Sequence, residues 1–184
     1  QYCNYFSTKN DATELCNLSG GVSYNSDRNA ERALNKVLSV IGLSKNFVLK
    51  QCNDISNCVA TSYKGIRYIL YDKQFMDVIA NKTNSWSQLS ILAHEVGHHI
   101  NGHSIDLVVY ATGSAEVPTL SESRQMELEA DEFSGFIMFH LGASLVQTQS
   151  AVQLLSDNNN DSRSTHPSRY KRLAAIEKGY NKAK

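Results

Sequence analysis

The stretch His94-Glu95-Val96-Gly97-His98 places two histidines four residues apart, with a glutamate directly after the first histidine. On an α-helix, residues four apart differ by about 400° of rotation, so His94 and His98 are expected on one face. Glu95 lies about 100° around from His94. This H-E-x-x-H spacing is typical of sites where two imidazoles bind zinc and the glutamate lies close to the ion without binding it.

The motif lies within a segment that has the pattern of a helix, from about Trp86 to Gly102, with Asn84-Ser85 as its cap. His94 and His98 are within about 40° of each other, away from the main apolar stripe of the helix. Side chains placed in this way are available to build a site. The stripe itself is expected to face the core and consists of Trp86, Leu89, Leu92, Ala93, Val96 and Ile100.

Length and composition favour one globular domain covering residues 1–184, because 184 residues with 41% hydrophobic content can form a core. The formal net charge is zero and the basic residues do not cluster, which argues against a nucleic-acid partner. No run of 18 apolar residues is present, so no transmembrane segment is expected. The start, Gln1-Tyr2-Cys3, does not have the pattern of a signal peptide and suits a mature chain whose leader has been removed.

The four cysteines fall into two local pairs among polar, Asn-rich turn residues. An even count in such contexts favours disulfides and an oxidising compartment. Of the three possible connectivities, Cys3–Cys16 and Cys52–Cys58 are favoured because the partners are close in sequence. The alternative is four free thiols in a cytosolic protein.

The predicted elements give an α+β fold that is mostly helical, with a small β-sheet packed beside the motif helix. Residues 1–24 have little periodicity and are expected to be irregular. The remaining predicted helices cover about 27–41, 73–80, 121–141 and 144–155, and a last helix has Pro167 as its first residue. Three strands are predicted over 47–51, 58–63 and 66–71, the last two joined by a turn at Lys64-Gly65.

A catalytic zinc site needs a third protein ligand. In the pattern H-E-x-x-H-x-x-G-x-x-H this ligand is a histidine ten residues after the first, but Ser104 holds that position and Asn101 replaces the glycine. His103 comes one residue early. On a continuing helix it would point about 140° away from His98, so it is not expected to bind the metal.

The better candidate is Glu127, in the segment Glu127-Leu128-Glu129-Ala130-Asp131 of the second long helix. A glutamate within an otherwise apolar helix is costly unless it is paired or coordinated. Asp131, one turn later on the same face, would accept a hydrogen bond from a ligand histidine. Glu129 points about 200° away and is not expected at the metal. The face also carries small residues that would let this helix pack closely on the motif helix: Ala130, Ser134 and Gly135.

Three motifs in this order resemble the HtpX/Ste24/BepA/Oma-type family of gluzincin zinc metallopeptidases. The resemblance covers about residues 84–175, and the extended spacing from His98 to His103 is similar to that of soluble periplasmic members. The motifs are His94-Glu95-x-x-His98, Ser123-Arg124-x-x-Glu127-x-x-Ala130-Asp131 and Thr165-His166-Pro167-x-x-x-x-Arg172-Leu173.

The resemblance implies a zincin-like domain, located in the periplasm or secreted, that acts on polypeptides. It implies that one zinc ion is bound by His94, His98 and Glu127, and that Glu95 is the general base. It further implies that His166 approaches the site and that Arg172 pairs with a carboxylate near it. Many family members span a membrane and this chain has no such segment, and residues 1–60 match nothing in the family, so substrate preference does not transfer.

The sequence therefore predicts a zinc endopeptidase, in which a metal-activated water attacks the peptide bond and Glu95 takes its proton. The substrate would lie extended along a strand edge, with Ile66–Tyr71 as the candidate strand and an ordinary core strand as the equal alternative. One alternative function is a proteolytically silent or latent zinc-binding chaperone or interaction module. Another is a structural zinc site closed by His103 or His166 as a fourth ligand.

Overall fold

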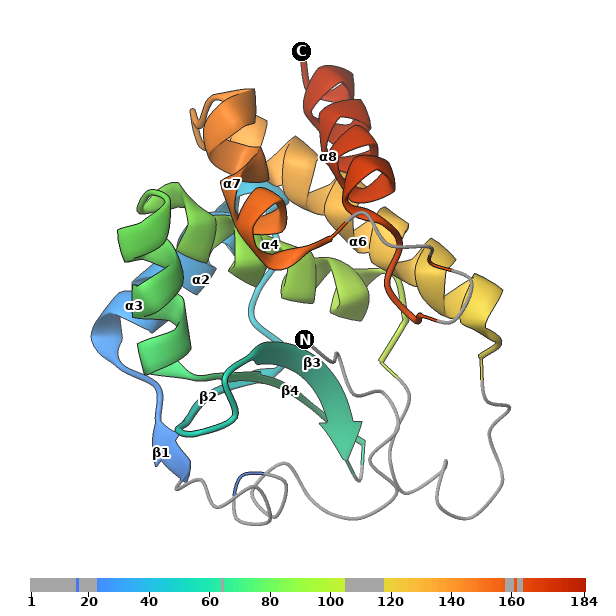
Figure 1. Cartoon of the computed structure of the whole chain (residues 1–184). Coiled ribbons are helices and arrows are strands. Elements are labelled where there is room, and N and C mark those ends of the chain that lie inside the picture. Colours follow the sequence, from blue (N-terminus) through green and yellow to red (C-terminus); the bar gives the residue numbers. More distant parts are fainter. Residues whose placement is uncertain (1–15, 17–22, 64, 105–117, 158–160, 162–163) are drawn as a thin grey trace.

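The computed structural model describes residues 16, 23–63, 65–104, 118–157, 161 and 164–184. Four strands form one small sheet at the base of the molecule in Figure 1, and helices lie above it. This confirms the predicted α+β fold with mostly helical content. In chain order the elements are β1 (Ser23–Asn25), α2 (Arg28–Val40), β2 (Val48–Cys52), β3 (Cys58–Tyr63), β4 (Ile66–Tyr71), α3 (Lys73–Lys82), α4 (Trp86–Ile100), α6 (Leu120–His140), α7 (Leu145–Leu155) and α8 (Arg169–Lys182).

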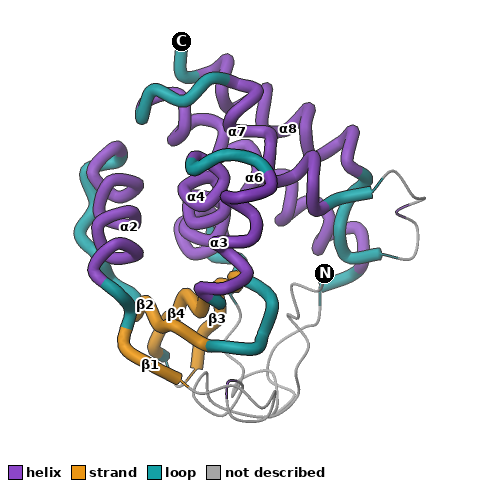
Figure 2. The backbone as a smooth tube through the Cα atoms, turned by 60° about the vertical axis from the view of Figure 1, so that its left-hand side comes forward, coloured by secondary structure: helices purple, strands orange, loops and turns teal. Residues whose placement is uncertain are grey.

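Helix α4 lies between the sheet and the upper helices, as the view in Figure 2 shows. Its residues Leu92, Ala93 and Val96 are buried in the main core, as the apolar stripe predicts. Ile100 belongs to that predicted stripe, but it is 40% exposed because α4 ends there. Among the described residues, no helix has the length and apolar character needed to cross a membrane.

The sheet has the strand order β1-β2-β4-β3, in which β2 and β4 are parallel and the other pairs are antiparallel. Tyr63 pairs with Ile66 across the predicted two-residue turn, where Gly65 has a φ of 76° that favours glycine. Among the described strands, this order places β3 at an edge and pairs β4 on both sides. The hypothesis that Ile66–Tyr71 receives the substrate is therefore wrong, because its backbone already pairs with two strands.

Reciprocal capping pairs begin two of the upper helices, Thr119 with Glu122 at α6 and Ser144 with Gln147 at α7. Each pair satisfies two backbone N–H groups at the helix start. Both helices start within one residue of their predicted positions.

The last helix begins at Arg169, so the prediction that Pro167 is its first residue is wrong. The segment before it is held as a loop. Arg124 on α6 donates to the carbonyl oxygens of Asp161 and Ser164, at 2.9 and 3.0 Å. These bonds keep the chain around Pro167 across the face of α6 before α8 starts.

Three helices cross at positions where side chains are small. Gly97 on α4 meets Ala130 on α6, and a Cβ atom at Gly97 would lie 3.2 Å from the Cα of Ala130. Gly135 was expected on this same contact, but it packs against α8, where a Cβ atom would overlap the carbonyl oxygen of Ile176. Gly179 of α8 makes the reciprocal approach to α6. Helix α6 is thus in close contact with α4 on one side and α8 on the other.

The disulfide joins Cys16 to Cys52, with Cα atoms 5.6 Å apart, and Cys58 is a buried free thiol. The predicted pairs Cys3–Cys16 and Cys52–Cys58 are therefore wrong, and Cys3 itself lies outside the described residues. Cys52 and Cys58 are on strands separated by β4, at least two strand spacings apart. They also belong to different apolar clusters, one containing Cys16 and Cys52 and the other containing Cys58.

Replacing Gly135 with alanine is expected to lower the free energy of unfolding by about 3 kcal/mol or more, because α6 and α8 would have to separate. Chemical denaturation measures the change. Glu177→Ala, at an exposed position on α8, is the matched control and should change stability by about 0.5 kcal/mol or less. A Gly135→Ala protein as stable as the control would contradict the close crossing.

Candidate metal centre

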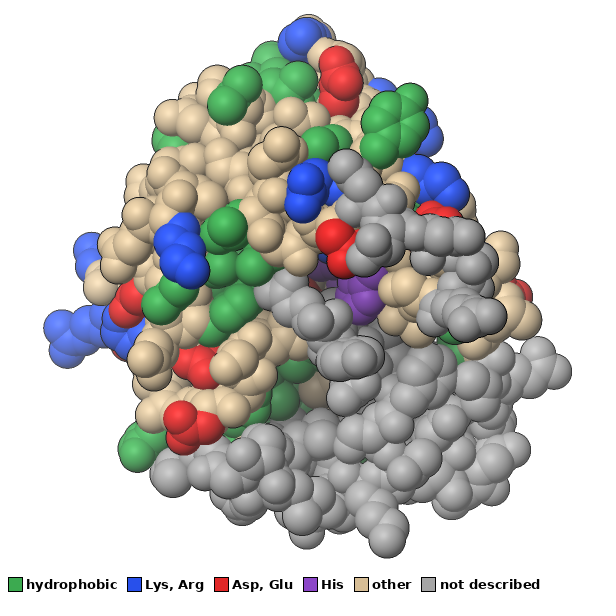
Figure 3. Space-filling view, viewed as in Figure 1, with side chains coloured by type: hydrophobic (Ala, Val, Ile, Leu, Met, Phe, Trp, Pro, Cys, Tyr) green, Lys and Arg blue, Asp and Glu red, His purple; other side chains and the backbone are tan. Residues whose placement is uncertain are grey.

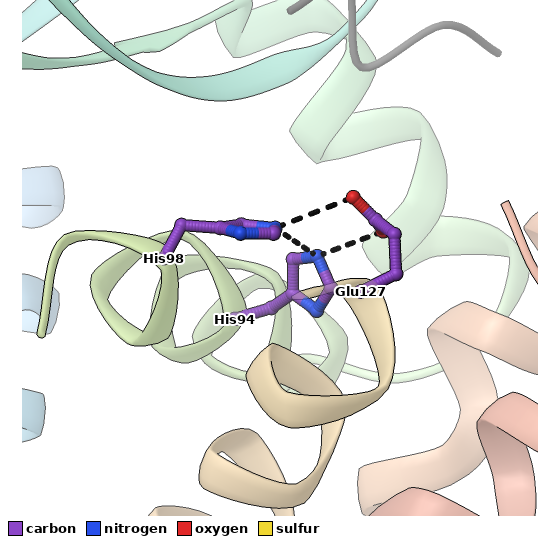
Figure 4. Close-up of side chains that lie close together, drawn as sticks. All are labelled: His94, His98 and Glu127. Atoms are coloured by element: carbon purple, nitrogen blue, oxygen red, sulfur yellow. Dashed lines mark hydrogen bonds and ion pairs between the residues drawn. The ribbon is translucent and has the colours of Figure 1, made fainter. Parts of the chain in front are cut away.

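Two imidazoles and one carboxylate from different helices converge at a buried point (Figure 4). Nε2 of His94 is 3.1 Å from Nε2 of His98, and each nitrogen is 3.4 Å from an oxygen of Glu127. The three candidate ligand atoms lie within 4.8 Å of one another. The histidines come from α4 and the carboxylate from α6, so the close crossing at Gly97 and Ala130 brings the set together.

The chemistry of this group fits a divalent cation. Both oxygens of Glu127 are buried, and neither accepts a hydrogen bond from a described residue. A buried carboxylate without hydrogen bonds is costly unless a positive charge compensates it. Two imidazole nitrogens and one carboxylate oxygen are a ligand set that suits zinc and leaves a fourth position open. His94, His98 and Glu127 are therefore the residues that would hold the ion.

The ionisation of the three residues shows how strongly they interact. Burial raises the pKa of Glu127, but the adjacent imidazoles outweigh this effect and hold it well below its usual value. Burial lowers the pKa of His94, but the carboxylates of Asp131 and Glu127 reverse this and raise it to about 10. Burial lowers the pKa of His98 despite the nearby Glu127. Without metal, one proton on His94 thus partly compensates the buried carboxylates.

Asp131 orients one of the candidate ligands. Its Oδ1 is 2.8 Å from Nδ1 of His94, which leaves Nε2 of that ring directed at the metal position. Arg172 of α8 donates to both oxygens of Asp131, at 2.7 and 2.8 Å. A carboxylate held in this way fixes the tautomer of a ligand histidine. The structure brings both predicted residues to this site, with Arg172 paired to Asp131.

Glu95 is buried, and its Oε2 accepts a hydrogen bond of 2.7 Å from the backbone N–H of Ala60 on β3. Burial raises the pKa of this carboxyl to about 7, and the negative charge of Glu127 adds to the effect. The motif glutamate thus faces the edge strand of the sheet. Sequence reasoning did not identify the contribution of Ala60, since the bond uses its backbone and no side-chain pattern reports it.

A cavity of about 290 Å³ opens beside this group and is lined by His94, Glu95, Glu127 and His166. Nε2 of His166 is 3.8 Å from an oxygen of Glu127, so the loop before α8 brings this side chain to the site, as predicted. Figure 3 shows histidine side chains within a hollow on this face of the molecule. The candidate ligands are therefore reached from a cavity on one face.

His103 and Glu129 are not in the candidate ligand group but lie behind His98, on the side of its Nδ1. Nδ1 of His103 is 3.2 Å from Nδ1 of His98, and its Nε2 is 3.0 Å from an oxygen of Glu129. His99 has a separate role, since it stacks on Phe47 and bonds the carbonyl oxygen of Tyr68. The sequence does contain one indication that His103 turns back toward His98. Gly102 precedes it, and glycine commonly ends a helix and reverses the chain.

Residues 105–179 match the family model described as Peptidase family M48. This match supports an M48-family zinc metallopeptidase. It contains Glu127, Asp131, His166 and Arg172, and it begins after His94 and His98. The match therefore does not include the two histidines. Their position beside Glu127 is an independent observation from the structure. No curated protein matches the chain.

The M48 family is zinc-dependent, and the raised pKa of His94 predicts that zinc binding displaces a proton. Below pH 10 His94 is protonated in the metal-free protein, whereas a zinc ligand must be neutral. Zinc affinity should therefore rise about tenfold per pH unit between about pH 6 and 8.

Chelator competition at several pH values measures this slope. Calorimetry in two buffers with different protonation enthalpies counts the protons released, with about one expected from His94. A pH-independent affinity would show that His94 is already neutral in the metal-free protein.

Proposed function

We propose that this protein is a zinc-dependent endopeptidase of the HtpX/Ste24/BepA/Oma type, acting as one metallopeptidase domain. The observation that carries the proposal is the convergence of His94, His98 and Glu127 beside the buried carboxyl of Glu95. The M48 match supports the same chemistry from a different part of the chain. When bound, a single zinc ion would supply a Lewis acid that polarises the scissile carbonyl and activates water.

Glu95 is the proposed general base. Its carboxylate takes a proton from the attacking water as the water oxygen bonds to the carbonyl carbon. The carbon–nitrogen bond then breaks, and Glu95 passes the proton to the leaving amine. Burial raises the pKa of Glu95 to about 7 in the metal-free protein, and a bound cation would lower it, which favours the carboxylate form that takes the proton.

The substrate would bind in extended form along the edge of β3 (Cys58–Tyr63). This strand pairs with β4 on one side, and the backbone N–H of Ala60 points to Glu95 on the other. Side by side with β3, an added strand would place its carbonyl groups near the general base. The edge strand thus replaces β4 as the proposed peptide-binding strand.

The cavity extends from the metal ligands to a set of apolar side chains and to a set of serine and aspartate side chains, which include Asp157 and Asp161. Arg172 is the only arginine or lysine among the described lining residues, and it is paired with Asp131. The site therefore favours an apolar side chain next to the scissile bond. The apolar walls come from α3, α4 and α7 and include Phe75, Ile91, Val152 and Leu155.

We further propose a periplasmic or secreted location. The Cys16–Cys52 disulfide favours an oxidising compartment, because such bonds rarely persist in the cytosol.

Replacing Glu95 with glutamine is expected to reduce peptide hydrolysis by about 10²-fold or more while zinc stays bound, because the amide cannot take a proton. Hydrolysis of an unfolded protein substrate and metal content by atomic absorption measure the two effects. Glu177→Gln, an exposed change on α8, is the matched control and should keep full activity. An active Glu95→Gln protein would exclude the mechanism.

The same assay tests the alternative of a silent or latent chaperone or interaction module. A wild-type protein that holds one zinc ion, binds unfolded chains and hydrolyses none of them would favour that alternative.

Peptides with leucine or phenylalanine beside the scissile bond should be cleaved at least about tenfold faster, in kcat/KM, than peptides with aspartate there. Leu155→Lys places a charge in the apolar wall and should reduce this preference. Leu154→Lys is the matched control, since Leu154 is 41% exposed and does not line the cavity. Equal preference in the two variants would show that this wall does not contact the substrate.

A further inference from the structure

The end of helix α4 turns the chain back toward the metal centre. Gly102 has a φ of 73°, and its N–H donates to the carbonyl of His99. The N–H of the next residue, His103, donates to the carbonyl of His98 at 2.9 Å. This pair of bonds is the helix-ending arrangement that glycine favours. It places the side chain of His103 beside that of His98 and not one helical step further on.

The two rings are in contact and buried. Their Nδ1 atoms are 3.2 Å apart, and their centroids are 5.3 Å apart in an edge-on arrangement. His98 is 0% exposed and His103 is 5% exposed. Nε2 of His103 then meets Oε2 of Glu129 at 3.0 Å. Two imidazoles in series therefore connect the metal position to the carboxylate of Glu129, whose side chain is 44% exposed.

The proton positions along this series follow from the metal site. His98 presents Nε2 to the metal position, so as a neutral ligand it carries its proton on Nδ1. That N–H must donate to Nδ1 of His103. The proton of His103 is then on Nε2, where it donates to Glu129. The reverse direction would need a proton on the nitrogen of His98 that binds the ion.

We propose that His103 and Glu129 are positioning residues that orient His98 for zinc, as Asp131 orients His94. The inference rests on the proposed zinc site and extends it to residues outside the ligand set. The two ligands are held differently. His94 is backed by a buried carboxylate paired to Arg172, whereas His98 is backed by a neutral ring and a partly exposed carboxylate. Glu129 should therefore contribute less than His103.

The test compares zinc affinity in wild-type, His103→Phe and Glu129→Gln proteins by chelator competition. His103→Phe keeps a ring but removes both nitrogens, and should weaken zinc binding about 10- to 100-fold. Glu129→Gln should weaken it by less. The double variant should match His103→Phe alone, because Glu129 acts only through His103. The visible bands of the cobalt-substituted protein should shift in His103→Phe, since the orientation of His98 changes.

Gln125→Ala is the matched control, because Gln125 contacts the other oxygen of Glu129 and not His103. Its zinc affinity should stay within about twofold of wild type. Thermal unfolding of each metal-free variant separates a loss of folding from a loss of zinc affinity. If His103→Phe does not fold, the zinc affinities of Glu129→Gln and Gly102→Ala test the inference instead. Both changes disturb the contacts from His98 through His103 to Glu129 without altering a buried ring.

Folded variants with wild-type zinc affinity and an unchanged cobalt spectrum would overturn the inference while leaving the proposed peptidase intact. A wild-type protein that binds no zinc would overturn both. A third outcome is a wild-type protein that binds zinc but hydrolyses no peptide, while His103→Phe binds zinc more weakly. That outcome would overturn the proposed function and support the positioning role of His103.

Discussion

The contact between α4 and α6 at Gly97 and Ala130 is the constraint on which the site depends. A Cβ atom at Gly97 would lie 3.1 to 3.2 Å from Phe133 and Ala130, so a larger residue there would shift α6 and with it Glu127 relative to the two imidazoles. The contact buries a carboxylate that has no hydrogen bond from a described residue. Packing of small apolar groups thus supplies the free energy that holds an unfavourable charge in place, and the charge then creates the need for a cation.

The surrounding elements fix the orientation of the ligands. Asp131 and Arg172 hold His94 from one side, and the reversed chain after α4 brings His103 to His98 from the other. The edge of β3 meets Glu95 through one backbone bond. Each candidate ligand histidine and the proposed general base therefore has its own support, and those supports come from α6, α8, β3 and the turn after α4.

The sequence was sufficient where the information is local. Helical periodicity located α4 and α6 closely, and the position of Glu127 in an otherwise apolar helix identified the third ligand candidate. The sequence was insufficient where a feature depends on how distant segments are arranged in the fold. The pairing of Cys16 with Cys52 and the edge position of β3 depend on strand order, which no short pattern encodes. His103 was misplaced because a continuing helix was assumed, although Gly102 ends it.

The disulfide lies with a small apolar cluster that is distinct from the core behind α4. Reducing agents and chelators therefore act on separate parts of this protein. Reduction would break the bond between Cys16 and Cys52 of β2, whereas Glu127 is not part of this covalent link. Loss of this disulfide is therefore no measure of the state of the candidate metal centre.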